Sequence, residues 1–155
     1  MTQATTSNIN TATKIPAHAS LETEPILTPN ERKVYAKLIA LGRSAGAYEL
    51  LDALRHEGIR AIPTIYRALK GLQDKGCVQH LVSTKSYVAV ENTQKARGPK
   101  LLLICDRCHK VTQLEEGGVL NMLTENVRQS GFAVQAEHLE LIVKCLNCNT
   151  QGAAP

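Results

Sequence analysis

The chain has no tryptophan and a single phenylalanine, and with four tyrosines its aromatic content is only 3% of 155 residues. Leucine, isoleucine, valine and alanine must therefore build most of any core, within a hydrophobic fraction of 43% that is ordinary for a globular protein. No apolar run approaches the roughly 18–20 residues that a membrane-spanning helix needs. A secretory signal pattern is also missing at the N-terminus. We expect a cytoplasmic chain with room for one ordinary domain or two small ones.

Recognisable catalytic motifs are missing as well. The sequence contains no nucleophile elbow, phosphate-binding loop or dinucleotide fingerprint. No set of histidine and carboxylate residues has a spacing typical of acid–base catalysis. We therefore expect no enzyme, no small-molecule substrate and no membrane partner.

Charge is distributed unevenly along the chain. Residues 26–100 carry 13 Lys and Arg against 6 Asp and Glu, whereas residues 101–155 carry 4 against 6. A basic half beside a mildly acidic half indicates that the first half meets a polyanion such as nucleic acid. An ordinary solvated surface is the alternative interpretation of the charge alone.

Three helices are predicted in the basic half. Thr28, Pro29 and Glu31 form a capping-box pattern for the first helix, which stops at Gly42. The second helix covers about residues 47–56, and the third runs from Pro63 to just before Gly76. The residues that these helices are expected to bury are Val34, Leu38, Ile39, Ala47, Leu50, Leu51, Leu54, Ile65, Leu69 and Leu72.

Two alternating runs, 78–82 and 86–90, follow the third helix and predict a hairpin with Lys85 in its turn. Three short helices and a hairpin are typical of a winged helix-turn-helix. The fold class is therefore expected to be α+β, with this winged helix followed by a small α/β domain. The predicted parts are a disordered tail (1–25), the winged helix (26–91), a hinge (92–100), the second domain (101–150) and a tail (151–155).

The second domain is predicted to alternate strands with one helix. The expected strands are 101–105, 110–114, 132–134 and 138–144. The expected helix covers about 119–130 and buries Leu120, Leu123 and Val127.

Two Cys-x-x-Cys pairs, Cys105 with Cys108 and Cys145 with Cys148, are separated by 36 residues. Each such turn directs two thiolates toward one point, and two turns complete the tetrahedron that zinc prefers. The strands and helix between the pairs explain a spacing longer than that of a simple zinc ribbon. Two disulfides, two separate redox motifs or a chance arrangement are the alternatives. A closed four-cysteine set predicts one structural zinc ion per chain that contributes to folding.

The third helix is predicted to expose Thr64, Tyr66, Arg67 and Lys70. A recognition helix places its first exposed side chains in the major groove of DNA. Arg67 suits a guanine, and Tyr66 suits a phosphate or a thymine methyl group. Lys70, one turn on, and Lys85, in the hairpin turn, suit backbone phosphates. Each of these residues, taken alone, is better interpreted as solvated surface, whereas a short helix, basic exposed positions and a following hairpin together favour DNA recognition.

These segments resemble the ferric uptake regulator family, and most closely its zinc uptake regulator branch. The resemblance rests on residues 44–54 (SAGAYELLDAL), residues 63–69 (PTIYRAL) and the two cysteine pairs, and it covers about 27–148. It implies a homodimer that binds double-stranded operator DNA, with a C-terminal dimerisation domain that carries the four-cysteine zinc. It also implies metal-dependent repression of metal-uptake genes, and operator contacts by Tyr48, Tyr66 and Arg67.

Members of this branch carry a second, regulatory zinc site between the two halves, built from His, Cys and Glu ligands. At the matching positions this chain has Gln79, Val90, Gly98, Gln113 and Ile142. Since valine, glycine and isoleucine side chains offer zinc no lone pair, the usual regulatory site is lost. The residues left for a rewired site are Cys77, His80, Glu91, His109 and His138. For Cys77 a buried apolar role is expected, with a ligand or redox sensor as the alternative.

The sequence therefore predicts a DNA-binding transcriptional regulator, a repressor that controls zinc homeostasis genes. Its DNA-competent form either needs no second metal or uses a rewired site. A second hypothesis is a family-like subunit that heterodimerises with a true metal sensor and modulates it. The Tyr66 and Arg67 pair favours direct contact with DNA.

Overall fold

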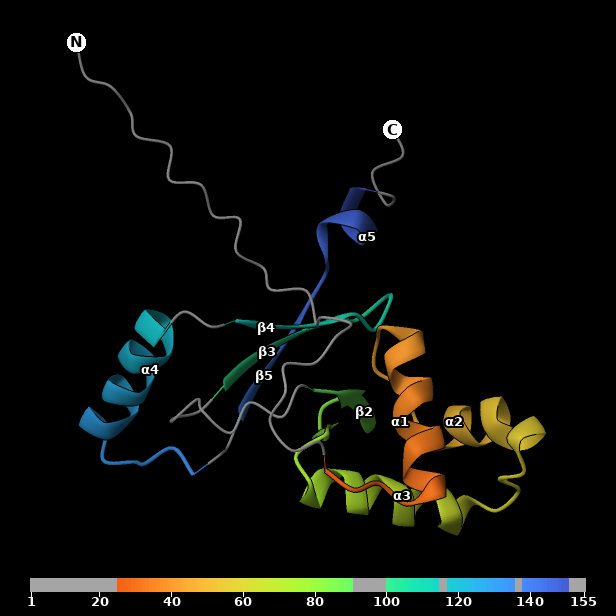
Figure 1. Ribbon diagram of the computed structural model, residues 1–155. Helices are drawn as coiled ribbons and strands as arrows, with labels where there is room; N and C mark the ends of the chain where they lie inside the picture. The colour runs from red at the N-terminus through yellow and green to blue at the C-terminus, as the bar shows by residue number, and fades with distance from the viewer. Residues whose placement is uncertain (1–24, 91–99, 115–116, 136–137, 151–155) are drawn as a thin grey trace.

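The structure is a computed structural model that describes residues 25–90, 100–114, 117–135 and 138–150. Its elements are α1 (Pro29–Leu41), α2 (Ala47–Leu54), the 3-10 turn η1 (Arg55–Glu57), α3 (Ile62–Asp74), β1 (Val78–Leu81), β2 (Ser86–Ala89), β3 (Lys100–Cys105), β4 (Val111–Leu114), α4 (Gly117–Gln129), β5 (His138–Val143) and α5 (Leu146–Thr150). Helices α1 to α3 gather at one end, α4 lies at the other, and the sheet of β3, β4 and β5 lies between them (Figure 1). Within these ranges no helix combines the length and apolarity that crossing a membrane requires.

The start and end of α1 follow its sequence signals. The backbone N–H of Glu31 donates to the Thr28 hydroxyl oxygen at 3.3 Å, and the Thr28 N–H donates to the Glu31 carboxylate at 2.7 Å. This reciprocal pair satisfies two amides that the first turn leaves without helical partners. Gly42 ends the helix with φ 60°, a left-handed conformation that glycine adopts without strain. The predicted capping box is confirmed.

The three helices share a core that includes nearly all the predicted apolar residues. The buried residues of this core are Val34, Leu38, Ala45, Ala47, Leu50, Leu51, Leu54, Ile59, Ile65, Ala68, Leu69, Leu72, Cys77, Val78 and Ala89. Ile39 was expected among them, and this prediction is wrong, because its side chain is 39% exposed. Val34 and Leu38 lie one turn apart on the buried face of α1, and the next residue is rotated by about 100° away from that face.

A buried carboxylate joins α1 to α3. Glu31 is 5% exposed, and its Oε2 lies 2.5 Å from Nζ of Lys75 at the C-terminal end of α3. This hydrogen bond and the one from Thr28 lower the pKa of Glu31, so the group is charged at neutral pH. Gly71 makes room for it, because a Cβ at that position would lie 2.0 Å from Glu31 Oε1.

Strands β1 and β2 form the predicted hairpin, with Val78 opposite Ala89 and Leu81 opposite Ser86. Both strands are one residue shorter than predicted. Ala45, before α2, adds an isolated antiparallel bridge to Tyr87 of β2. The hairpin is thereby tied to the start of α2.

In the second sheet β3 is central, antiparallel to β4 and parallel to β5. Lys100, which the sequence placed in a hinge, pairs with His138 and begins β3. The predicted hinge otherwise lies outside the described residues, as do residues 1–24 of the first tail and residues 151–155. The strand predicted at 132–134 is wrong: the described residues offer it no neighbouring strand, and Phe132 is 72% exposed.

Helix α4 buries less than its apolar pattern predicts. Leu120 is 8% exposed, whereas Leu123 is 43% exposed and Val127 is half-buried. The prediction for Leu123 is wrong for the single chain, since α4 lies at the outer end of the molecule (Figure 1) and no described element covers that face.

A second core joins the hairpin to the three-stranded sheet. Its buried residues are Leu81, Val88, Leu102, Ile104 and Val111, with Val90 packed against them. Two of these residues come from the hairpin and three from β3 and β4. The N-terminal half (25–90) and the C-terminal half (100–150) therefore share buried apolar surface.

Candidate metal centre and nucleic-acid interface

The first cysteine pair lies in the tight turn between β3 and β4. The backbone N–H of Cys105 donates to the carbonyl of Lys110 at 2.9 Å, and the N–H of His109 donates to the carbonyl of Cys105 at 3.0 Å. His109 closes the turn with a φ of 58°. These bonds fold the chain back, so the Cys108 side chain returns toward Cys105.

The second pair follows β5. Because β3 and β5 are parallel, with Cys105 opposite Val143, their C-terminal ends lie at the same edge of the sheet. The N–H of Asp106 donates to the carbonyl of Val143 at 3.0 Å, which joins the two turns. The N–H of Cys148 donates to the carbonyl of Cys145 at 3.0 Å as α5 begins. The parallel pairing thus brings together cysteines that are about 40 positions apart in the sequence.

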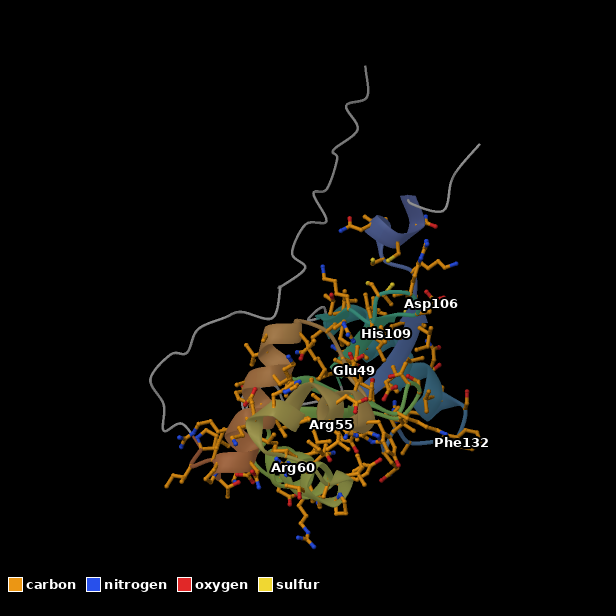
Figure 2. All side chains as sticks on the ribbon, turned by 90° about the vertical axis from the view of Figure 1, so that its right-hand side faces the viewer. Glu49, Arg55, Arg60, Asp106, His109 and Phe132 are labelled. Atoms are coloured by element: carbon orange, nitrogen blue, oxygen red, sulfur yellow. The ribbon has the colours of Figure 1, made fainter. Side chains whose placement is uncertain are left out.

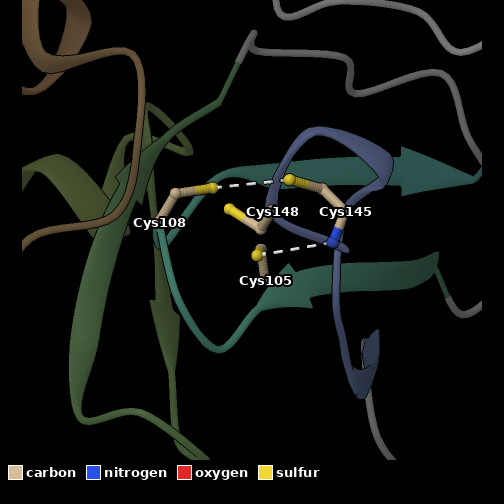
Figure 3. A group of neighbouring side chains, drawn as sticks. All are labelled: Cys105, Cys108, Cys145 and Cys148. Atoms are coloured by element: carbon tan, nitrogen blue, oxygen red, sulfur yellow. Dashed lines mark hydrogen bonds between the residues drawn. The ribbon is translucent and has the colours of Figure 1, made fainter. Parts of the chain in front are cut away.

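The four sulfur atoms form one cluster (Figure 3). All lie within 4.8 Å of one another, and Sγ of Cys108 is 3.7 Å from Sγ of Cys145. Zn–S bonds of about 2.3 Å in a tetrahedron place sulfurs about 3.8 Å apart, so the cluster has nearly the size of a zinc site. All five cysteines lie in the described ranges and are free thiols, which argues against the disulfide alternative. The cluster can hold a metal ion.

The thiols in this cluster differ in acidity. The backbone N–H of Cys145, 3.4 Å from the Cys105 sulfur, and then that of Cys108 lower the pKa of Cys105 to about 6. Hydrogen bonding to the Cys145 thiol and burial raise the pKa of Cys148 to about 12. One thiolate therefore forms readily, whereas four adjacent thiolates need a cation that offsets their mutual repulsion. This donor set fits zinc.

Helix α3 presents the polar face that the sequence predicts. Tyr66 is 47% exposed, Arg67 and Lys70 are exposed, and Thr64 is half-buried. Lys70 Nζ lies 2.6 Å from Oδ1 of Asp74 on the next turn of the same helix, so its charge is partly engaged. The structure brings Thr64, Tyr66 and Arg67 together in the first turns of α3.

Two other predicted residues lie on neighbouring segments. Tyr48, near the start of α2, is 68% exposed. Lys85 is exposed in the turn between β1 and β2, where it adopts a φ of 50°. Arg60 is also exposed, two residues before α3 begins, and lies at the opposite end of the molecule from Asp106 of the first cysteine turn (Figure 2).

The described candidates for a rewired regulatory site do not form a group of three ligands around one point. Cys77 is buried and its pKa is raised by burial, as expected for an apolar thiol. The rings of His80 and Tyr87 lie 4.7 Å apart, and Nε2 of His138 lies 3.0 Å from Oε1 of Glu140. Among the described residues, the four cysteines are the one group of three or more potential ligands near enough to share an ion. Glu91 and Gly98 lie outside the described residues, and the rewired site remains a prediction.

Residues 27–142 match the model of the ferric uptake regulator family. The chain is 32% identical over 123 residues to the zinc uptake regulation protein of Escherichia coli strain K12, with 79% of this chain and 72% of that protein covered. The protein of the same name from Shigella flexneri matches with the same identity and coverage.

Solved structures show the same likeness. A zinc uptake regulator complexed with zinc and DNA superposes with a TM-score of 0.69 at 32% identity, over 83% of this chain and 87% of that chain. The holo form of XcZur superposes with a TM-score of 0.64 at 37% identity, over 80% and 86%. The predicted α+β fold with an N-terminal winged helix is confirmed. The chain belongs to the ferric uptake regulator family.

Proposed function

We propose that the chain is a DNA-binding transcriptional regulator that acts as a homodimer and represses zinc homeostasis genes. The observation that carries this proposal is the exposure of Tyr66 and Arg67 in the first turns of α3, within a winged helix. Membership of the ferric uptake regulator family and 32% identity to a zinc uptake regulation protein support it. A similar solved chain is a zinc uptake regulator complexed with zinc and DNA.

The proposed contacts follow from side-chain chemistry. Arg67 presents a planar donor fork that suits the O6 and N7 acceptors of guanine in the major groove. Thr64 and Tyr66 lie beside it, and Tyr48 reaches the phosphates that flank the groove. Lys85 neutralises a phosphate from the hairpin turn. Lys70 neutralises another phosphate once it leaves its ion pair with Asp74. Breaking this pair costs little free energy because both side chains are exposed.

We also propose that the four cysteines hold one structural zinc ion per chain. Zinc would join the turn after β3 to the turn after β5 and so contribute folding free energy. Four thiolate ligands leave no open coordination position, which argues against a catalytic role. Reduced thiols of this kind belong in the cytoplasm, where we place the protein.

The homodimer accounts for apolar surface that the single chain leaves in water. The exposed apolar residues of the C-terminal half that an interface would cover include Val119, Met122, Leu123, Phe132, Leu141 and Ile142. Two copies would present two α3 helices, which suits an operator with two half-sites.

DNA binding by the dimer either needs no second zinc ion or depends on zinc at a rewired regulatory site, and experiment separates the two. Val90, at a position that matches a regulatory ligand in related proteins, packs against the second core. The Gln79 amide donates to the carbonyl of His80 at 3.2 Å. These structural roles favour a DNA-competent form that needs no second zinc ion. A rewired site is the other form, and an adaptor that heterodimerises with a metal sensor is the alternative function.

Direct DNA recognition is tested in two steps. The zinc-loaded wild-type protein first selects the DNA duplexes that it binds from a random pool, and the affinities of wild type and variants for a selected duplex are then measured. Arg67→Ala is expected to weaken binding by about 1–3 kcal/mol at one base position. Arg128→Ala is the control, since Arg128 lies on α4 and pairs with Glu125. A wild-type protein that selects no duplex, or an Arg67→Ala protein that binds as tightly as wild type, overturns direct DNA recognition and favours the adaptor. Repeating the titration with added zinc separates the two metal responses.

A further inference from the structure

One carboxylate of the C-terminal half contacts the hairpin turn of the N-terminal half. Glu140 of β5 accepts the backbone N–H of Val82 on Oε1 at 2.8 Å and the backbone N–H of Ser83 on Oε2 at 2.9 Å. The Ser83 hydroxyl also donates to Oε2. Only 11% of the Glu140 side chain is exposed. We call this set of hydrogen bonds the Glu140 contact.

The Glu140 contact depends strongly on the orientation of the hairpin turn. Both oxygens of one carboxylate accept from two consecutive backbone amides, so the turn must stand in one orientation to be bound. The bonds are charge-assisted and stronger than neutral ones. Desolvation raises the pKa of Glu140, but the hydrogen bonds from Ser83, His138 and Val82 outweigh it and lower the pKa to about 2. Glu140 is therefore an anion at neutral pH, as the contact requires.

The turn that Glu140 binds also carries Lys85. Residues 82–85 form the turn, and Lys85 lies two residues beyond Ser83 with a left-handed φ of 50°. The hydroxyls of Thr84 and Ser86 lie 2.7 Å apart and stiffen the turn between these points. The position of Val82 and Ser83 on β5 thus determines where Lys85 is presented.

Glu140 acts from the same strand that leads to the second cysteine pair. β5 ends at Val143, two residues before Cys145. Leu81, the last residue of β1 and the one directly before the turn, is fully buried in the core shared with β3 and β4. The hairpin turn is therefore held on the cysteine-bearing sheet by apolar packing at its base and by a carboxylate on its amides.

We propose that Glu140 is a positioning residue for DNA binding, which fixes the hairpin turn and Lys85 relative to the cysteine-bearing sheet without touching DNA itself. This inference rests on the proposed function and assigns Glu140 and Ser83 a role in it. Glutamine at position 140 keeps the length of the side chain but places an NH₂ donor opposite one of the two amide donors. Glu140→Gln therefore breaks one arm of the contact and removes its charge.

The first measurement needs no DNA. Amide hydrogen exchange in the zinc-loaded protein at pH 7 is expected to show slow exchange at Val82 and Ser83, and at least about tenfold faster exchange in Glu140→Gln. Glu125→Gln, an exposed carboxylate on α4 that pairs with Arg128, is the matched control and leaves both amides slow. Ser83→Ala removes the hydroxyl bond to Glu140 and keeps both amide bonds. It replaces Glu140→Gln in this test if Glu140→Gln fails to retain zinc. It is expected to speed exchange at Ser83 by a smaller factor. Unchanged exchange in both variants overturns the inference.

The second measurement couples Glu140 to Lys85. Glu140→Gln is expected to weaken binding to the selected duplex by about threefold to tenfold and to reduce the salt slope by about 1, as Lys85→Ala does. In a Lys85→Ala background, Glu140→Gln should cost no further affinity, because its effect acts through that lysine. Equal or tighter binding by Glu140→Gln, or a loss that adds fully to that of Lys85→Ala, overturns the inference. A wild-type protein that binds no duplex overturns the proposed function instead, and amide exchange then still tests the Glu140 contact.

Discussion

Ser44 and His109 are joined by two hydrogen bonds that connect the N-terminal half to the first cysteine turn. The Ser44 backbone N–H donates to the His109 carbonyl at 3.0 Å, and the Ser44 hydroxyl donates to the same oxygen at 3.3 Å. Ser44 is 2% exposed, and His109 directly follows Cys108. The two bonds therefore join the cysteine turn directly to the segment that leads into α2.

Ser44→Ala removes the hydroxyl bond and keeps the amide bond. The free energy of unfolding of the zinc-loaded protein is expected to fall by about 1 kcal/mol, the usual net value of one such bond. Ser130→Ala is the control, because Ser130 is exposed and its hydroxyl bonds to the carbonyl of Asn126 within α4. Urea denaturation compares them, and equal midpoints for the two variants would contradict a role for the Ser44 hydroxyl.

Gly71→Ala tests the contact between α1 and α3. Alanine favours a helix over glycine by about 1 kcal/mol, yet the new Cβ would meet Glu31 Oε1 at 2.0 Å. Glu31 cannot move without loosening its bonds to Lys75 and Thr28. We expect a net loss of about 1–3 kcal/mol in the free energy of unfolding.

Gly118→Ala on α4 is the matched control, since nothing lies within 4 Å of its added Cβ. This variant should be neutral or slightly more stable than wild type in the same denaturation experiment. A Gly71→Ala protein at least as stable as wild type would show that Glu31 yields without cost.

Much of this architecture could be predicted from local signals. The Thr28 cap and the face of α3 that carries Arg67 follow from short-range spacing, and the pairing of the two cysteine turns follows from the tetrahedron that four thiolates complete around zinc. Leu123 was assigned to a core because an apolar pattern does not distinguish a chain's own core from an interface with another chain. The Glu140 contact joins residues 57 positions apart through backbone amides, which leave no trace in a pattern of side chains.

The Glu140 contact also predicts a pH dependence. The hydrogen bonds from Ser83, His138 and Val82 lower the pKa of the Glu140 carboxyl in the folded protein to about 2, from an ordinary value of 4.5. The stability that it contributes is therefore fully present above about pH 4.5 and is lost as the pH falls toward 2. The shift corresponds to about 3 kcal/mol as an upper value.

Denaturation of wild type and Glu140→Gln in parallel isolates this contribution, because both proteins lose zinc in acid through the same cysteines. The difference in unfolding free energy should be fully present above about pH 4.5 and should shrink as the pH falls from there toward 2. A difference that stays constant or grows below about pH 4.5 would contradict the assignment.

The zinc content of cysteine variants distinguishes Cys77 from the four cysteines of the cluster. Wild type is expected to hold one ion per chain, and Cys148→Ser should lose most of it because a closed tetrahedron loses a ligand. Cys77→Ser is the control, since Cys77 is buried in the helical core and should leave the zinc content unchanged. Elemental analysis of the purified proteins measures both, and a full complement of zinc in Cys148→Ser would remove that residue from the site.

The dependence of DNA affinity on the cysteine-bound zinc tests the central claim most directly. The measurement is the affinity of the wild-type protein for its selected duplex, first zinc-loaded, then after chelation, then with one equivalent of zinc per chain restored. We expect chelation to weaken binding by at least about tenfold and one equivalent to restore it, because the ion joins the turns that support the winged helix. Full affinity in protein that contains no zinc would contradict the account.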